Sequence, residues 1–373
     1  MSLVVVPFLH EDPEVVARTL TLAASHPRVV EVVGVYCEPS PIEAVRAMVD
    51  DSIRLMPQQR IGSLREGKGD ATNTGLRYFL EETDHERVHF FDGDIRTFEA
   101  GWIERAERTA DQGYPAVRHY YPRAATDGMI TWMVTKTGLA LSHPGSVLTR
   151  IRQPLAGELM FTRRAASTLW TDQRIRRQSD WGIDTMLTFV SVQSGLPIAE
   201  VYEEAGKDHA LYGALTDLKV MACECLAVLQ RIRGCELPAS SDHWVEPAIL
   251  SRSPVVGKVA YDLEATIDGL GEPWRQQELA LLDRFPDRVA KGLAGLERWP
   301  VVGFMDEEAW WEFLTVALDG FQLGNTAWEN VFFRGFTCRV LDYTLRVALT
   351  GHEKAMSSLE QMISEAELWG SQR

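Results

Sequence analysis

Short apolar segments rich in β-branched residues alternate with segments of helical spacing over the first 200 residues of the chain. Consecutive strands that are joined through helices run parallel, so this alternation predicts an α/β fold with a mainly parallel, buried sheet. The expected strands cover residues 3–8, 29–36, 87–91 and 116–120, and the expected helices cover residues 13–24, 41–53, 72–82, 99–112, 128–140, 162–170 and 183–193.

The pattern changes beyond residue 215, where segments with helical spacing follow one another without strand-like runs between them. We therefore expect two domains, a catalytic domain at residues 1–215 and an α-helical domain at residues 216–373 that serves packing or homo-oligomer formation. The expected helices of the second domain cover residues 215–232, 257–270, 274–293, 307–321 and 328–349, with an irregular linker at 234–256.

The formal net charge of the chain is −15, from 53 acidic and 38 basic residues. A charge of this sign repels nucleic acid and anionic membrane surfaces, so neither is an expected partner. No stretch approaches the roughly 18 apolar residues that a membrane-spanning helix needs. The apolar run at residues 3–8 is too short for a signal core and has no basic flank, so a cytoplasmic enzyme is the simplest interpretation.

Two acids, Asp92 and Asp94, flank Gly93 directly after the expected strand at residues 87–91. This position places both carboxylates at the carboxyl edge of the sheet, where open α/β sheets bind ligands. Oxygen ligands at this spacing can share one Mg²⁺ or Mn²⁺ ion, which would neutralise a diphosphate. The alternative is a hairpin turn, since Asp-Gly between apolar runs is also a turn signal. A helix rather than a partner strand is expected next, which favours the metal interpretation.

A glycine-rich segment at residues 67–70 precedes the expected helix that starts near Thr72. Its glycines would let the backbone approach a phosphate, and Lys68 and nearby Arg60 add positive charge. The spacing of a P-loop is absent. The alternative is an ordinary loop in which Asp70 or Thr72 caps the helix, but the downstream Asp-Gly-Asp motif favours binding of an anionic donor.

Three further side chains are candidates with open alternatives. Asp184 can bind sugar hydroxyls or accept a proton from an acceptor, or it is a solvated helix acid. Arg123, followed by Thr131, can bind a carboxylate through two hydrogen bonds, or it forms a surface salt bridge. A lone histidine such as His209 is more often structural than a ligand.

Several longer motifs occur in a recognisable order: GKGD followed by Asn73, then DGD, RHYYPRAATDGMITWM, QPLAGEL, SDWGIDT and GKDHALYGALTDLKVM. In this order they resemble the mannosylglycerate synthases, which are retaining GT-A glycosyltransferases of compatible-solute synthesis. The resemblance is dense up to about residue 225 and returns around FMDEEAW and RVLDYTLRVAL. It implies a Rossmann-like GT-A fold, a GDP-mannose donor, a D-glycerate acceptor, a divalent metal (Mn²⁺ or Mg²⁺), and α-mannosylglycerate and GDP as products.

The resemblance also implies roles for individual residues. Asp94 and His209 would coordinate the metal, and Asp184 would bind the transferred sugar near the reacting carbon. Lys68 and Asp92 would contact the donor and, with Asp184, act in catalysis. The remaining implied donor contacts are Pro7, Gln58, Gly93 and Leu155. Of these, Gln58 would contact the base and Leu155 would lie beside the sugar. The implied acceptor contacts are Arg123, Thr131 and Tyr212.

Two positions depart from the family on the nucleotide side: Leu9 replaces an expected lysine, and the loop at Tyr36 and Cys37 is one residue shorter. GDP-glucose or UDP-glucose therefore remain alternative donors, and lactate and glycolate share the acceptor's carboxylate and hydroxyl.

A nucleotidyltransferase is disfavoured because no glycine-rich basic loop follows residues 3–8, and a non-catalytic nucleotide-sugar binder is disfavoured by the intact motif. Without an evident nucleophile, front-face attack is the expected mechanism, with a departing phosphate oxygen or Asp184 as proton acceptor.

Overall fold

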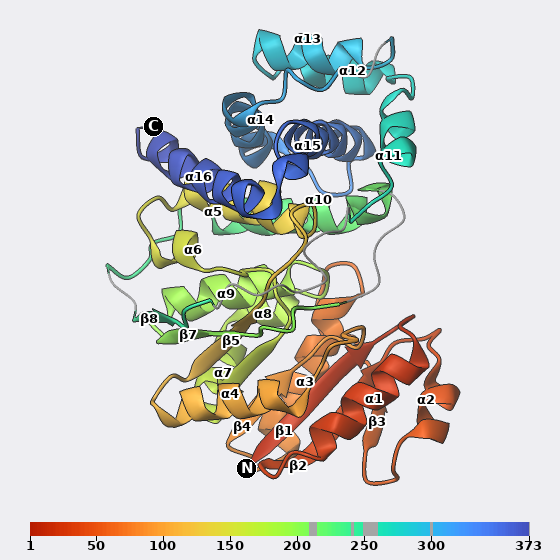
Figure 1. The fold of residues 1–373 in the computed structure, drawn as a ribbon, viewed down its shortest axis with the longest axis vertical. Coiled ribbons are helices and arrows are strands. Elements are labelled where there is room, and N and C mark those ends of the chain that lie inside the picture. Colours follow the sequence, from red (N-terminus) through yellow and green to blue (C-terminus); the bar gives the residue numbers. More distant parts are fainter. Residues whose placement is uncertain (209–214, 240–241, 249–259, 299–300, 373) are drawn as a thin grey trace. The chain divides into compact units, whose positions relative to one another are not determined.

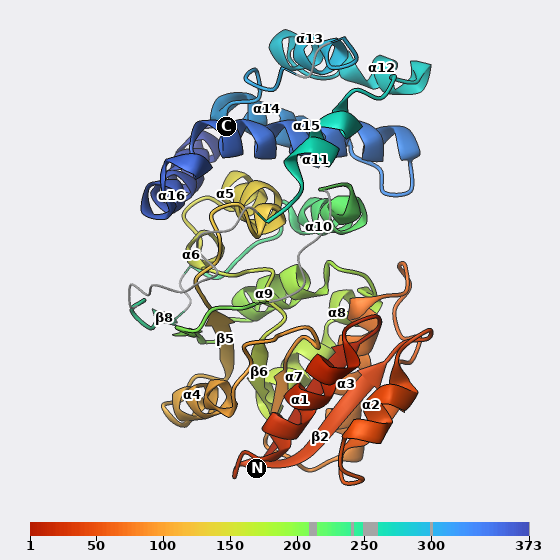
Figure 2. The ribbon, with the colours of Figure 1, turned by 45° about the vertical axis from the view of Figure 1, so that its right-hand side comes forward.

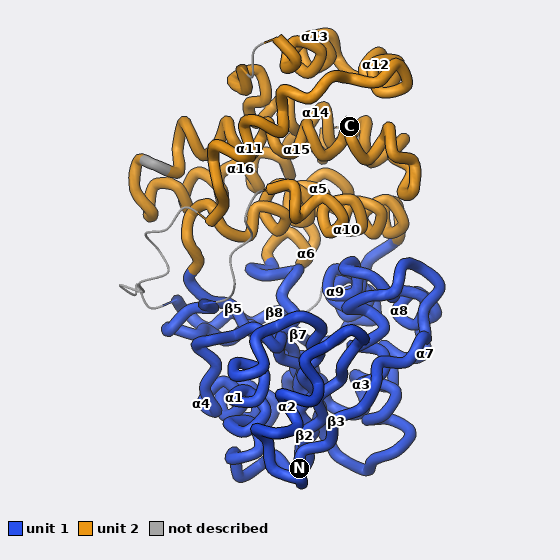
Figure 3. Tube along the Cα trace, turned by 90° about the vertical axis from the view of Figure 1, so that its right-hand side faces the viewer, with its two compact units in different colours: residues 1–122, 151–210, 236–253 blue, residues 123–150, 211–235, 254–373 orange. Residues whose placement is uncertain are grey.

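A computed structural model describes residues 1–208, 215–239, 242–248, 260–298 and 301–372 of the 373-residue chain. Its residues form two compact units, coloured separately in Figure 3: unit 1 holds residues 1–122, 151–210 and 236–253, and unit 2 holds residues 123–150, 211–235 and 254–373. This division differs from a single boundary at residue 215, since residues 123–150 group with unit 2 and 236–253 with unit 1.

Unit 1 is built on one eight-stranded sheet in the order β3-β2-β1-β4-β6-β5-β7-β8. Each adjacent pair of strands is parallel, except that β6 runs antiparallel to both β4 and β5. The expected mainly parallel sheet is confirmed. The strands are β1 (Ser2–Phe8), β2 (Val29–Tyr36), β3 (Arg54–Pro57), β4 (Arg87–Phe90), β5 (Ala116–Tyr120), β6 (Leu159–Thr162), β7 (Ile198–Tyr202) and β8 (His243–Val245).

Helices cover both faces of this sheet (Figures 1 and 2). One layer contains α1, α2 and α4, and the other contains α3, α7 and α9, with α8 beside α7 and α9. A sheet covered on both faces explains why its strands are continuous apolar runs rather than alternating ones. The helices of unit 1 are α1 (Pro13–Ala24), α2 (Ile42–Met48), α3 (Lys68–Glu82), α4 (Ala100–Asp111), α7 (Arg163–Thr171), α8 (Gln173–Arg177) and α9 (Ile183–Gln193).

The described part of unit 2 is helical, as expected, and its core contains the buried rings of Trp310, Phe313 and Trp328. None of the helices in the described ranges is long and apolar enough to cross a membrane. The helices are η1 (Ile130–Lys136, a π-helix), α5 (Thr137–Ser142), α6 (Val147–Arg150), η2 (Leu215–Leu218), α10 (Lys219–Ile232), α11 (Leu263–Leu270), α12 (Gln276–Leu282), α13 (Asp287–Gly295), α14 (Glu307–Gly320), α15 (Thr326–Arg346), η4 (Ala348–Thr350) and α16 (His352–Ser371).

Several expected elements were wrong in extent. The expected helix at residues 41–53 ends at Met48, and the next residues lead into β3, which was not expected. The expected helix at 274–293 is two helices, because Pro286 cannot continue the first one and instead precedes α13. The expected linker at 234–256 contains β8, which pairs with β7 in parallel.

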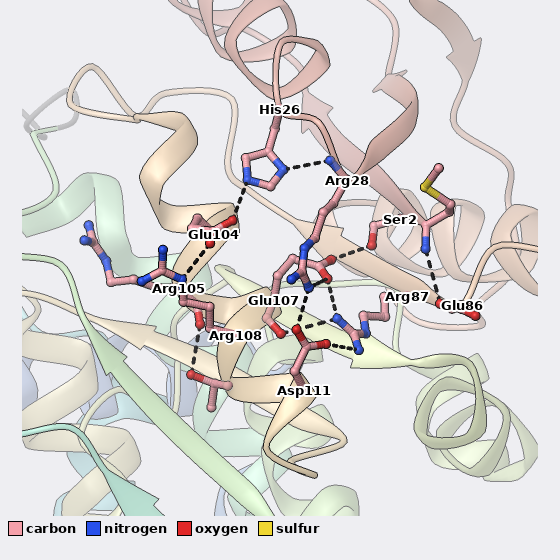
Figure 4. A network of polar contacts seen from close by, with 12 residues as sticks. Ser2, His26, Arg28, Glu86, Arg87, Glu104, Arg105, Glu107, Arg108 and Asp111 are labelled. Carbon is pink, nitrogen blue, oxygen red and sulfur yellow. Dashed lines mark hydrogen bonds and ion pairs between the residues drawn. The ribbon is translucent and has the colours of Figure 1, made fainter.

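A network of buried and half-buried charges lies at the amino edge of the sheet (Figure 4). Glu107 of α4 is 1% exposed and accepts hydrogen bonds from Ser2, Arg87 and His89, the last at 2.8 Å. Ser2 and Arg87 begin the neighbouring strands β1 and β4. Glu107 therefore fixes α4 to the edge of the sheet opposite to the carboxyl ends of the parallel strands.

We expect Glu107→Gln to lower the free energy of unfolding by about 3 kcal/mol, since breaking a buried charge pair leaves its partners uncompensated. Burial opposes ionisation of Glu107, but His89, Ser2 and Arg87 outweigh burial and hold its pKa below the ordinary 4.5. The contribution is therefore present above pH 4.5 and is lost as the pH falls below it. Urea titrations at neutral and acidic pH test this. Asp111→Asn, at a side chain that is 44% exposed, is the control and should change stability by less than about 1 kcal/mol.

Candidate active site

The Asp-Gly-Asp motif lies at the carboxyl end of β4, next to the end of β1. Phe91 continues from β4 and donates a backbone hydrogen bond of 3.1 Å to Val5. A side chain at Gly93 would place its Cβ 3.0 Å from the carbonyl oxygen of Pro7, so the motif and the end of β1 are in close contact. The strand β4 pairs with β1 and β6, and the chain after Asp94 leads to α4. The hairpin alternative is therefore wrong.

Lys68 connects two of the predicted acids. Its Nζ atom lies 2.8 Å from Oδ1 of Asp92 and 3.0 Å from Oδ2 of Asp184. Lys68 lies at the start of α3, Asp92 follows the end of β4, and Asp184 lies at the start of α9. Their side chains are only 12%, 21% and 3% exposed, respectively. Asp184 is thus a buried, paired carboxylate, and the alternative of a solvated helix acid is wrong.

Sequence reasoning missed two further charged members of this network. Nζ of Lys207 lies 2.7 Å from Oδ2 of Asp92 and 2.7 Å from Oε1 of Glu158, and 4.0 Å from Oδ1 of Asp94. The second oxygen of Glu158 accepts a hydrogen bond of 3.0 Å from the hydroxyl of Tyr121. Both oxygens of Asp92 are therefore paired with lysines, and Lys207 is the charged group that links Asp92 to Glu158.

The two paired aspartates are shifted in opposite directions. Burial alone would raise the pKa of Asp92, but the charges of Lys207 and Lys68 outweigh it and hold that pKa well below its ordinary value. The pKa of Asp184 is raised, because burial and the negative charge of Asp92 together outweigh the opposing effect of the nearby Lys68. The two lysines therefore favour the carboxylate form of Asp92, whereas Asp184 has the greater affinity for a proton.

Within the segment at residues 67–70, Lys68 is the residue whose side chain contacts Asp92 and Asp184. A Cβ at Gly69 would lie 2.7 Å from the backbone carbon of Ser179, so this glycine permits close packing against the protein's own backbone. Asp70 is buried and accepts hydrogen bonds from the amides at residues 61 and 62, at 3.0 and 2.7 Å, and from Arg60. Asp70 is therefore an anchor for the preceding loop rather than the helix cap, and Arg60 is its ion-pair partner.

The chain after β7 is tied to the residues that follow the Asp-Gly-Asp motif. The amide of Arg96 donates to the carbonyl of Asp208 at 2.8 Å. The hydroxyl of Thr97 donates to the carbonyl of Gly206 at 2.7 Å and accepts from the amide of Asp208 at 3.0 Å. The predicted residues His209 and Tyr212 lie outside the described residues. Among the described residues no group of three or more metal-ligating side chains occurs.

The remaining predicted residues lie in three places. Gln58 follows β3. Its backbone amide donates a hydrogen bond of 2.7 Å to the carbonyl of Tyr36, and its side-chain amide donates one of 3.2 Å to Glu66. Leu155 is half-buried in the segment that leads to Gly157 and β6. Arg123 and Thr131 belong to unit 2, where Arg123 pairs with Asp127 at 3.4 Å and Thr131 is buried in η1. The Arg123 side chain is 14% exposed, so its ion pair is not a surface salt bridge.

Gly157 lies directly against the Lys68–Asp92 pair. A Cβ at this position would be 2.6 Å from Oδ1 of Asp92 and in steric conflict with Nζ of Lys68. We expect Gly157→Ala to displace the pair and lower kcat/KM by about 10- to 100-fold, because small misplacements of positioned groups have effects of this size. Steady-state kinetics test this. Gly101→Ala, where the nearest atom to the new Cβ is 3.9 Å away, is the control and should leave kcat/KM unchanged.

A mainly parallel sheet with two acids after a central strand, followed by a helical carboxyl-terminal part, defines the chain as a GT-A glycosyltransferase. The family models for the mannosylglycerate synthase GT domain and C-terminal domain match residues 2–231 and 255–363. The chain belongs to the mannosylglycerate synthase family.

Two relatives and a set of solved structures are similar to the chain. The mannosylglycerate synthase of Rhodothermus marinus is 46% identical over 97% of this chain and 94% of its own, and that of Selaginella moellendorffii is 45% identical over 98% and 90%. Glucosyl-3-phosphoglycerate synthase from Mycobacterium tuberculosis, solved with Mg²⁺ and UDP, has a TM-score of 0.51 at 20% identity and covers 64% of this chain and 81% of its own. At that identity the likeness shows the fold alone.

Proposed function

We propose that this enzyme transfers mannose from GDP-mannose to the 2-hydroxyl of D-glycerate, with retention at the anomeric carbon, to give α-mannosylglycerate and GDP. The observation that carries the proposal is the buried bridge from Asp92 through Lys68 to Asp184 at the carboxyl edge of the sheet. The names of the two relatives support the product. The net charge of −15 supports small-molecule partners rather than nucleic acid.

The arrangement of strand ends supports a path for the donor. The ends of β4, β1, β2 and β3 lie in this order across the sheet, so the path runs from Asp92 past Pro7 to Gln58. A nucleotide sugar with its diphosphate near Gly93 would extend its base toward Gln58 and its sugar toward Leu155 and Asp184. Lys68 would lie beside the diphosphate and the transferred sugar.

A metal at Asp94 and His209 fits the residues present. Asp94 is 30% exposed and lies two residues from Asp92, which is 21% exposed, and Arg96 holds Asp208, the residue before His209, by a backbone hydrogen bond. A carboxylate, an imidazole and donor phosphate oxygens together suit Mn²⁺ or Mg²⁺. Two solved glucosyl-3-phosphoglycerate synthase structures hold Mg²⁺ and Mn²⁺, which supports a divalent ion in this fold. Such an ion would stabilise the departing diphosphate.

Arg123, Thr131 and Tyr212 are the proposed acceptor residues. Arg123 follows Tyr121 by two residues, and Tyr121 is hydrogen-bonded to Glu158 of the charged network. A guanidinium at this position can bind the glycerate carboxylate through two hydrogen bonds.

The reaction we propose is a front-face displacement. The bond between the anomeric carbon and the diphosphate oxygen breaks, the bond to the glycerate hydroxyl oxygen forms on the same face, and the hydroxyl proton passes to the departing diphosphate oxygen. Lys68 holds Asp184 beside the reacting carbon, where its carboxylate would stabilise positive charge on the sugar. Because Asp184 is already paired with Lys68, it is poorly placed to act as a covalent nucleophile.

The experiment that tests donor and acceptor is a matrix of nucleotide sugars against small hydroxy acids. GDP-mannose, GDP-glucose and UDP-glucose are combined with D-glycerate, lactate and glycolate, with Mg²⁺ or Mn²⁺, and nucleotide release is measured. We expect the highest kcat/KM for GDP-mannose with D-glycerate. A higher value for UDP-glucose would reject the proposed donor, and nucleotide release that does not depend on an acceptor would reject transfer.

A further inference from the structure

Four carboxylates and two lysines meet at the candidate site, and we call them the charged cluster: Asp92, Asp94, Glu158, Asp184, Lys68 and Lys207. Each aspartate or glutamate carries one negative charge and each lysine one positive charge, so the formal charge of the cluster is −2. The roles proposed above use both acids of the motif, Asp184 and Lys68. They leave Lys207 and Glu158 without a function.

Lys207 and Glu158 are expensive groups to bury. Their side chains are 7% and 0% exposed, and a buried ion pair adds little stability over a packed apolar pair. Lys207 does more than pair with Glu158, since its Nζ atom lies 2.7 Å from Asp92 and 4.0 Å from Asp94. Its charge is therefore close enough to both acids of the motif to act against any cation that binds there.

We propose that Lys207, anchored by Glu158, is an internal counter-ion of the metal site that weakens metal binding until the donor diphosphate arrives. The inference rests on the proposed function, which places the metal at Asp94. Without a nucleotide, the ammonium group repels the metal ion. With a nucleotide, the negative charge of the diphosphate compensates Lys207, so that metal and nucleotide each strengthen the binding of the other. Lys207 also holds Asp92 in place, and is a positioning residue in this sense.

The test is a charge series. We would titrate the wild type, Lys207→Met, Glu158→Gln and the double variant with Mn²⁺, following free Mn²⁺ by electron paramagnetic resonance, with and without GDP. The formal charges of the cluster are −2, −3, −1 and −2 in this order. Without GDP, Lys207→Met should bind Mn²⁺ roughly tenfold more tightly than the wild type, Glu158→Gln roughly tenfold more weakly, and the double variant about as tightly as the wild type.

The coupling to nucleotide gives a second expected result. The ratio of the Mn²⁺ dissociation constants without and with GDP should fall in Lys207→Met, because the repulsion that GDP relieves is gone. The same variant should lose kcat, since Asp92 loses one of its two lysine partners. Weaker Mn²⁺ binding in Lys207→Met, or no change in either single variant, would overturn the proposal.

Two controls separate the possible failures. Circular dichroism melting shows whether each variant folds, and the double variant keeps the charge balance if a single variant does not fold. Asp94→Asn tests the site itself. If Asp94→Asn leaves Mn²⁺ affinity unchanged, the metal assignment within the proposed function is wrong. If Asp94→Asn weakens Mn²⁺ binding while the charge series is flat, only the counter-ion proposal fails.

Discussion

Asp94→Ala is expected to lower kcat by about 10²- to 10³-fold, because a preorganised electrostatic contact to the departing group has an effect of this size. Asp94 belongs to the Asp-Gly-Asp turn, and Arg96 two residues later holds the residue that precedes His209. His209→Ala should therefore show a loss similar to that of Asp94→Ala, together with a higher Mn²⁺ concentration for half-maximal rate.

Initial rates of GDP release at varied Mn²⁺ test this prediction. Asp111→Asn is the matched control, since this acid lies in the polar network at the amino edge of the sheet (Figure 4) and should leave kcat unchanged. Full turnover in both Asp94→Ala and His209→Ala would show that the metal site has been assigned to the wrong residues.

Lys68→Met should lower kcat/KM by about 10³-fold or more. The substitution leaves Asp92 with one lysine partner and removes the lysine partner of Asp184, and an uncompensated buried charge is strongly unfavourable. The pKa of Asp184 is already raised by burial and by Asp92, and Lys68 lowers it. Without Lys68 this pKa rises further, so the ionised form that the mechanism requires is lost at a higher pH.

The pH dependence of kcat/KM distinguishes this account from simple loss of structure. The acidic limb of the profile should move to higher pH in Lys68→Met and stay near its wild-type position in Lys68→Arg. Lys291→Met is the control, at a surface lysine that is 78% exposed. A uniform loss of activity in Lys68→Met without movement of the acidic limb would contradict the assigned role.

The sequence predicted most accurately the helices and strands that a single pattern of apolar residues is enough to identify. β1, β2 and α1 follow runs of β-branched or helically spaced apolar residues, and their bounds were predicted to within one residue. β3 and β6 were not expected: β3 has four residues and carries little apolar signal, and β6, also of four residues, is antiparallel among parallel strands. α16 was not expected.

The candidate site was predicted only in part, because a local pattern marks some of its residues and contacts between distant segments mark the others. Acids after an apolar strand are a local signal, which identified Asp92, and the structure joins it to Asp184 through Lys68 over a separation of more than 90 residues along the chain. Lys207 and Glu158 lay within motifs that the sequence singled out, but lysine and glutamate are usually exposed. Only the pairing of three distant segments reveals that they are buried together.

The proposed retaining transfer is tested most directly by the anomeric configuration of the product. Enzyme, GDP-mannose, D-glycerate and Mn²⁺ are incubated in a nuclear magnetic resonance tube, and the anomeric proton and its one-bond carbon coupling are recorded before and after addition of a chelator. We expect α-mannosylglycerate and an equal amount of GDP, with formation stopped by the chelator. A β-linked product, or transfer that continues at full rate without metal, would contradict this expectation.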